Sequence, residues 1–218
     1  MSAVADRIMK RVRAKGRGWV FTPKHFIDFG TRGSVDMALS RLAQAGEIRR
    51  IGRGLYDYPQ LHHKLGALTP DAEMIALAMS AQSGDQLAPS AATAANGLGL
   101  STQVQAKPSY ATTGPTRVRM AAGRSITLKH SRAPVLRNAS DAANGVVQIL
   151  AGLGRNKVDA DAISQLAARL DGKDLQALLK GRGAMPGWMG DVVLRFDAHH
   201  RRTLDAIRDG KRPPEGLS

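Results

Sequence analysis

The stretch GSVDMALSRLAQAGEIRRIGRGLYDYP, residues 33–59, predicts one helix followed by a tight two-stranded hairpin. Ser34 is a good N-cap, and apolar residues recur behind it at helical spacing until Gly46 ends the helix. Two strand-like segments, residues 47–51 and 55–58, flank a turn of sequence Gly-Arg-Gly. The helix and the hairpin together form the second half of a small module.

The residues before this stretch predict two more helices and a short strand. Apolar side chains at helical spacing indicate a first helix over about residues 4–15, and the apolar residues 19–21 are typical of a strand. Thr22 supplies an N-cap and Pro23 the first turn of a short second helix. Helix, strand, helix, turn, helix and hairpin in this order predict a winged helix-turn-helix over residues 1–60.

The remainder of the chain predicts a larger α+β domain. We expect a linker at residues 61–70, the larger domain at 71–210 and a disordered tail at 211–218. Within the larger domain, strand-like runs lie at about 109–130, and Ala-rich amphipathic segments predict helices over about 139–209. The expected fold class is mixed α/β (α+β) and mainly helical, with a small β-sheet in the larger domain.

Positive charge is concentrated near the start of the chain. The 218 residues have a formal net charge of +14, and residues 1–64 contain 13 basic but only 5 acidic side chains. Such an excess favours an acidic partner, of which nucleic acid is the commonest. Aromatic residues make up only 4% of the chain, which argues against stacking on single-stranded bases. The expected partner is therefore double-stranded DNA.

The candidate DNA-binding residues are polar and basic side chains on the third predicted helix and the hairpin. Residues at the helix N-terminus can meet phosphates, and those along the exposed face can reach base edges in the major groove. Arginines beside the glycine turn can approach the DNA backbone or a minor groove. The set is Thr31, Arg32, Ser34, Met37, Ser40, Arg41, Gln44, Arg49, Arg50 and Arg53. Further candidates on the first helix are Arg7, Lys10, Arg11, Arg13 and Lys15. For every residue, a solvated basic face is the alternative.

Residue patterns that indicate catalysis are sparse. The chain has no cysteine, which excludes disulfides, Cys-ligated metals and a cysteine nucleophile. The histidine pairs at 62–63 and 199–200 lack the i, i+4 spacing of a helical metal site, and the acids at 159–161 and 171–174 are typical of helix N-termini. We therefore expect no enzymatic activity, no metal and no cofactor. With no apolar run of membrane-spanning length and no signal peptide, we expect a soluble cytoplasmic protein.

Two segments resemble the AbiEi family of antitoxins and transcriptional regulators. The first is residues 33–59, quoted above. The second is LAPSAATAANGLGLSTQVQAKPSYATTGPTRVRMAAGRSITLKHSRAP, residues 87–134, which is similar to the helix-plus-strand region that follows the winged helix in that family. The combination of the two segments is more specific than either alone.

The resemblance implies a toxin–antitoxin operon with a role in phage defence. In the family, the N-terminal winged helix binds repeats in its own promoter and represses the operon, and the larger part neutralises a nucleotidyltransferase-like toxin, a partner whose direct contact with the chain stays open here. The resemblance assigns DNA binding to two groups of residues in this sequence. They are Arg32, Ser34, Ser40 and Arg41 on the third helix, and Arg49, Arg50 and Arg53 on the hairpin.

Two other functions remain open at this point. One is an adaptor that binds nucleic acid without sequence preference and binds a protein through its C-terminal half. The other is an enzyme that acts on nucleic acid. Binding to a specific site, as opposed to equal, salt-sensitive binding to any duplex, separates a repressor from an adaptor.

Overall fold

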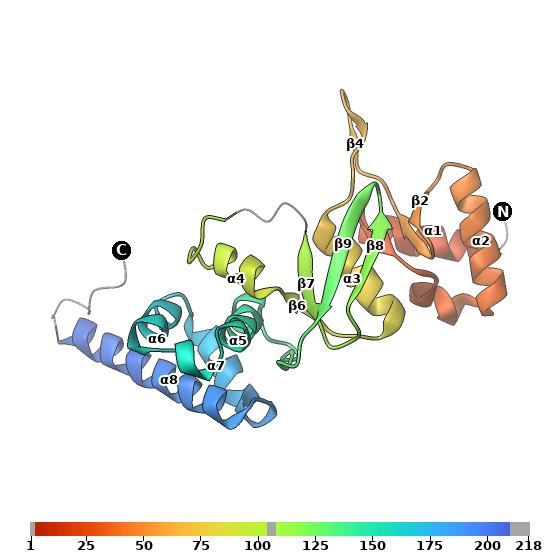
Figure 1. The fold of residues 1–218 in the computed structure, drawn as a ribbon. Coiled ribbons are helices and arrows are strands. Elements are labelled where there is room, and N and C mark those ends of the chain that lie inside the picture. The colour runs from red at the N-terminus through yellow and green to blue at the C-terminus, as the bar shows by residue number, and fades with distance from the viewer. Residues whose placement is uncertain (1–2, 104–107, 210–218) are drawn as a thin grey trace. The chain divides into compact units, whose positions relative to one another are not determined.

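The computed structural model of the chain describes residues 3–103 and 108–209, and its fold is α+β and mainly helical, as the sequence predicts (Figure 1). Contacts within the chain define two compact units. The first comprises the described parts of residues 1–87 together with 116–128, and the second comprises the remainder.

The first unit begins with the element order that the sequence predicts. The elements are α1 (Ala3–Lys15), β1 (Val20–Phe21), the 3-10 helix η1 (Pro23–Phe29), α2 (Arg32–Gln44), β2 (Arg49–Gly52) and β3 (Leu55–Asp57). The strands form an antiparallel sheet of order β1-β3-β2, in which β3 is central. We call the β2–β3 hairpin, residues 49–57, the wing.

Two local details differ from the prediction. The second helix is a 3-10 helix, and Thr31, not Ser34, is the N-cap of α2. The backbone of Thr31 is extended, and its side chain accepts a hydrogen bond of 3.3 Å from the backbone N–H of Ser34. Ser34 therefore lies in the first turn of the helix, where its hydroxyl donates back to the carbonyl of Thr31 at 2.8 Å.

One hydrophobic core joins α1, η1, α2 and the sheet. Leu39 and Leu42 on the inner face of α2 share this core with Phe26 of η1 and with Ile48 and Tyr56 of the hairpin region. Burial of apolar surface is the main favourable term in folding. Because α2 and the wing bury side chains in the same core, they are held in a fixed arrangement.

Segments outside residues 1–60 also belong to the first unit. The predicted linker contains a small hairpin, β4 (Leu61–His62) and β5 (Gly66–Ala67), and α3 (Ala72–Ser83) follows it. The hairpin of β8 (Arg117–Ala121) and β9 (Arg124–His130) joins the unit up to Leu128. The compact units thus differ from the expected domain boundaries, because α3 packs against β1 and β3 and because β8 contacts β2.

The second unit is built mostly of helices. Its elements are α4 (Ala91–Gly97), β7 (Ser109–Thr112), α5 (Asp141–Leu153), η2 (Arg155–Lys157), α6 (Ala160–Ala167), α7 (Gly172–Gly181), η3 (Arg182–Ala184) and α8 (Gly187–Arg208). The strands β6 (Leu87–Pro89), β7, β9 and β8 form a four-stranded sheet in that order, so this sheet is not confined to the second unit. The core of this unit includes Val146 and Leu150 of α5 and Phe196 of α8.

Of the four acidic residues that the sequence associates with helix N-termini, Asp159 and Asp171 are N-caps, and Asp161 and Asp174 lie in the first turn. The side chain of Asp159 accepts from the backbone N–H of Ala162 at 2.8 Å, and that of Asp171 from the N–H of Asp174 at 2.7 Å. No described helix combines the length and apolar character needed to cross a membrane. The tail predicted at 211–218 lies outside the described residues.

Helices α4 and α5 approach each other closely because glycines face alanines. A Cβ atom at Gly145 would lie 2.7 Å from Cβ of Ala94, and one at Gly152 would lie 3.3 Å from Cβ of Ala91. The first distance is too short for any side chain unless one of the helices shifts.

Substituting Gly145→Val should therefore destabilise the second unit by about 2 kcal/mol through overpacking. Gly97→Ala is the matched control, since a Cβ there meets nothing within 4 Å and the change stiffens only the unfolded chain. Urea unfolding followed by circular dichroism measures both. Equal stability of the two variants would show that the α4–α5 contact is more compliant than its geometry indicates.

His25 links η1 to its N-cap. The backbone N–H of Thr22 donates to Nδ1 of His25 at 3.1 Å, which requires that this nitrogen be unprotonated. Burial lowers the pKa of His25 below its ordinary 6.5, and the nearby charges of Arg11 and Lys15 lower it further, whereas a hydrogen bond that protonated Nδ1 would donate to the carbonyl of Thr22, 3.3 Å away, acts in the opposite direction.

Because the unfolded chain binds this proton more readily than the folded chain, the contribution of His25 to stability is complete above about pH 6.5 and falls as the pH drops below that value. The His25→Gln variant retains an acceptor at the third helical position but does not titrate. Its midpoint of urea unfolding should consequently depend less on pH between 7.5 and 5.5 than that of the wild type. Parallel pH profiles would contradict this assignment.

Candidate nucleic-acid interface

Helix α2 has one polar, exposed stripe opposite its buried face. The stripe consists of Gly33, Met37, Ser40, Arg41 and Gln44, all of which are exposed. The opposite face, Val35, Ala38, Leu39 and Leu42, is buried in the core of the first unit. Met37 is an apolar side chain with 56% exposure in the middle of the polar stripe. Four of the candidate residues named from the sequence, Met37, Ser40, Arg41 and Gln44, therefore lie with Gly33 on one continuous surface of a rigid element.

The remaining predicted residues at the start of α2 have local partners. Thr31 caps the helix, and Ser34 in its first turn bonds back to Thr31, as described above. The Arg32 guanidinium pairs with the carboxylate of Asp36, one turn further on, at 2.8 Å, and both side chains remain about half exposed. Pairs of this kind contribute little to stability because water and salt screen them, so Arg32 can exchange Asp36 for another anion at low cost.

The arginines of the wing are of two kinds, one paired within the protein and two exposed. Arg49 makes a two-point contact with the carboxylate of Asp57, Nε to Oδ1 at 3.0 Å and Nη2 to Oδ2 at 2.6 Å, and Nη2 also donates to the carbonyl of Leu68 at 2.8 Å. The side chain of Asp57 is 1% exposed. Arg50 on the neighbouring position and Arg53 at the turn are exposed. The hydrogen bond to Asp57 raises the pKa of Arg49, so this cation is a structural partner of a buried carboxylate.

The arginines of α1 are likewise engaged within the unit. Arg11 contacts both carboxylate oxygens of Asp28, at 2.9 and 2.7 Å, and its guanidinium lies 4.0 Å from the ring centroid of Phe29. Arg7 lies over the same ring, 4.4 Å from its centroid. The hydrogen bond from Arg11 lowers the pKa of Asp28. These contacts hold α1 against η1, which favours a structural role for this pair over phosphate binding.

Residues that the sequence analysis did not single out extend the basic surface of the first unit. Arg117 and Arg119 lie two positions apart on β8, and therefore on one face of the strand. Nη2 of Arg117 lies 2.6 Å from a carboxylate oxygen of Asp85, and Nη2 of Arg119 donates to the carbonyl of Arg53 at 2.6 Å. The alternation Arg-Val-Arg-Met at 117–120 is a visible signal of two arginines on one face, but it does not reveal that they lie beside the wing.

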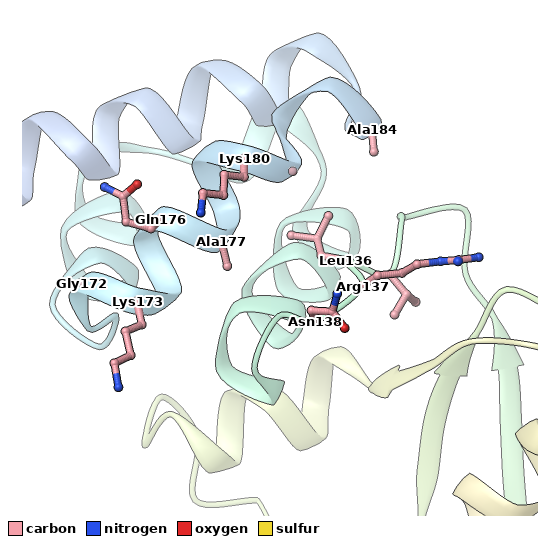
Figure 2. Close-up of a pocket in the computed structure, with 11 residues that line it drawn as sticks. Leu136, Arg137, Asn138, Gly172, Lys173, Gln176, Ala177, Lys180 and Ala184 are labelled. Carbon is pink, nitrogen blue, oxygen red and sulfur yellow. The ribbon is translucent and has the colours of Figure 1, made fainter.

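The second unit has a groove between α7 and the loop before α5 (Figure 2). Its volume is about 770 Å³, and Leu136 and Ala177 contribute apolar surface while Arg137, Lys173 and Lys180 contribute positive charge. Among the described residues that line it, there is no acidic, histidine or hydroxyl side chain. Within the described part of the chain, no group of three or more His, Asp or Glu side chains could hold a metal ion. The described lining of the groove thus offers no carboxylate and no imidazole, the usual general bases and metal ligands.

The asymmetry of the Arg49–Asp57 pair yields a test of which wing arginines are structural. In Arg49→Ala, Asp57 loses its cation while staying buried, so the free energy of unfolding should fall by about 2 kcal/mol, somewhat less than for a fully buried pair. Arg50→Ala, next to it and exposed, should unfold like the wild type. Urea titration of both variants measures the difference. If both variants are as stable as wild type, the Asp57 carboxylate must have another hydrogen-bonding partner or be protonated.

Comparison with known proteins identifies a family for this chain, but that family has no assigned activity. No curated protein and no solved structure matches the chain. Residues 7–178 match the model of DUF6088, a family of unknown function. The matched span begins in α1 and ends in α7, so it includes α2, the wing and the β8–β9 hairpin. The chain therefore belongs to the DUF6088 family of unknown function.

Proposed function

We propose that this chain is a sequence-specific, double-stranded DNA-binding transcriptional regulator. In this proposal, α2 enters the major groove and the wing contacts the adjacent sugar–phosphate backbone. The observation that carries it is the exposed polar stripe of α2, which lies on a helix whose opposite face is anchored in the same core as the wing.

The distribution of paired and unpaired arginines supports this proposal. Among the described residues, no carboxylate lies within ion-pair distance of Arg41, Arg50 or Arg53, whereas Arg49 and Arg11 have close acidic partners. An unpaired, exposed cation can neutralise a phosphate, which releases a counterion condensed on the DNA. We therefore assign phosphate contact to Arg50 and Arg53, and a supporting role to Arg49.

The chemistry of the stripe suits base-edge contacts. An arginine such as Arg41 can donate two hydrogen bonds to guanine, and a glutamine such as Gln44 can bond both the N6 and N7 positions of adenine. Ser40 can donate or accept, and the exposed side chain of Met37 can meet the methyl group of thymine. Gly33, without a side chain, permits close approach of the helix N-terminus to the DNA.

The resemblance to AbiEi proteins extends the proposal to a biological setting. We infer that the chain acts in the cytoplasm, represses its own promoter by binding repeats there, and serves as antitoxin to a nucleotidyltransferase-like toxin. The repressor part is supported by the surface of the first unit. The antitoxin part is supported by the resemblance over residues 33–59 and 87–134.

A fluorescence-anisotropy titration of the full chain tests the proposal directly. The probes are a duplex from the DNA upstream of the protein's own reading frame and a scrambled duplex, each at two salt concentrations. We expect a preference for the upstream duplex of about a thousandfold or more. Equal, salt-sensitive affinity for both duplexes would contradict sequence-specific regulation and favour an adaptor with a non-specific basic module.

Variants of the two surfaces should behave differently in this titration. Arg50→Ala and Arg53→Ala should weaken binding to both duplexes and lower the salt slope by about 1 each, because each removes one phosphate contact. Ser40→Ala and Arg41→Ala should reduce the preference for the upstream duplex, because they remove base contacts. Arg155→Ala, an exposed arginine of η2 in the second unit, is the control for net charge. Equal losses on both duplexes for the Ser40 and Arg41 variants would exclude their role in sequence recognition.

A further inference from the structure

The tip of the wing is held by residues far away in the sequence. Arg119 on β8 donates one hydrogen bond from Nη2 to the backbone carbonyl of Arg53 at 2.6 Å, and a second from Nη1 to Oε1 of Gln82 on α3 at 2.6 Å. One guanidinium thus joins the wing tip, β8 and α3. All three segments belong to the first unit.

Backbone contacts reinforce this connection on both sides of the turn. The backbone N–H of Ala122 donates to the carbonyl of Ile51 at 2.9 Å. A Cβ atom at Gly52 would lie 3.3 Å from the carbonyl oxygen of Met120, and one at Gly54 would lie 2.6 Å from Nε2 of Gln82. Glycine at positions 52 and 54 therefore lets the turn lie directly against β8 and α3, and Gly54 also has a positive φ of 66°.

The electrostatic surroundings show that this is a close cluster of like charges. Burial lowers the pKa of Arg119 from its ordinary value, and the charges of Arg117 and Arg53 lower it further. Asp85 contacts Arg117 at 2.6 Å, which offsets part of this repulsion. Repulsion between neighbouring cations costs free energy. Binding of an anion such as a phosphate would relieve this repulsion, so the arrangement suits a surface that meets an anion.

We propose that Arg119 is a positioning residue for DNA binding, which fixes the turn of the wing so that Arg53 meets the phosphate backbone in one orientation. This inference rests on the proposed function. In a hairpin anchored only at its base, the tip would be mobile and Arg53 would lose conformational entropy on binding. Arg119 removes the backbone part of that cost before DNA arrives, so the β8–β9 hairpin contributes to DNA binding through the wing.

The first arm of the test is hydrogen exchange of the full chain without DNA. In Arg119→Ala, amides of residues 51–55 should exchange about tenfold faster than in the wild type, because charge-assisted hydrogen bonds are lost. Arg119→Lys retains the charge but not the planar fork that spans two acceptors, and it should also speed exchange. Arg124→Ala, an exposed residue of β9 in the same hairpin, removes one charge without loosening the wing and should exchange like the wild type.

The second arm measures affinity for a duplex that the wild type selects from a randomised pool. We expect Arg119→Ala to bind it about tenfold more weakly, and Arg53→Ala/Arg119→Ala to lose less affinity than the sum of the two single losses, since the two residues act through one contact. Arg119→Lys should keep the salt slope of the wild type while binding more weakly, which a purely electrostatic role would not produce.

The outcomes separate this inference from the proposed function. Wild-type exchange at residues 51–55 in both Arg119 variants, or strictly additive losses in the double variant, would overturn the positioning role. If the wild type selects no duplex, the proposed function fails. Faster exchange in the Arg119 variants would then still establish that Arg119 holds the wing, without a role in DNA binding.

Discussion

A buried carboxylate on the central strand of the small sheet determines how the surface of the first unit is arranged. Asp57 is almost completely inaccessible to water, and a charge in that position requires a partner. Arg49 supplies it from the opposite position on β2. Because side chains alternate along a strand, an arginine that faces inward at 49 places Arg50 on the other face. The position of Arg50 therefore follows from the Arg49–Asp57 ion pair on the opposite face of the strand.

Most of the first unit could be predicted because its elements are specified by neighbouring residues. Thr22 and Pro23 mark the start of η1, the glycine at 46 follows the end of α2, and glycines flank the tip of the wing. The apolar stripe of α2 likewise identified both the buried face and the exposed one. Each of these signals acts over fewer than about five residues, the range over which backbone preferences are local. The exact cap of α2 was missed because Thr31 and Ser34 are both good caps and only the backbone distinguishes them.

The roles of individual arginines could not be predicted, because they depend on partners distant in sequence. Arg11 pairs with Asp28, 17 positions away, and Arg119 bonds to the backbone of Arg53 across 66 positions. Composition alone counts every arginine equally toward the net positive charge. In the structure, some arginines form internal pairs and others are exposed. The Arg32–Asp36 pair is the exception, since its i, i+4 spacing is visible in the sequence. The inclusion of the β8–β9 hairpin in the first unit was missed for the same non-local reason.

The path of the chain has a consequence for how such a protein can be divided or recombined. The backbone passes from the first unit to the second after residue 87, returns after 115 and leaves again after 128, so three peptide segments connect the two. A fragment ending at the wing would lack α3 and β8, and with them the donors and acceptors that face the turn. Exchange of the first 60 residues between relatives would likewise combine a wing from one protein with its supports from another. The first unit is thus built from a discontinuous set of segments, so a substitution within residues 116–128 alters the same unit as a substitution within residues 1–87.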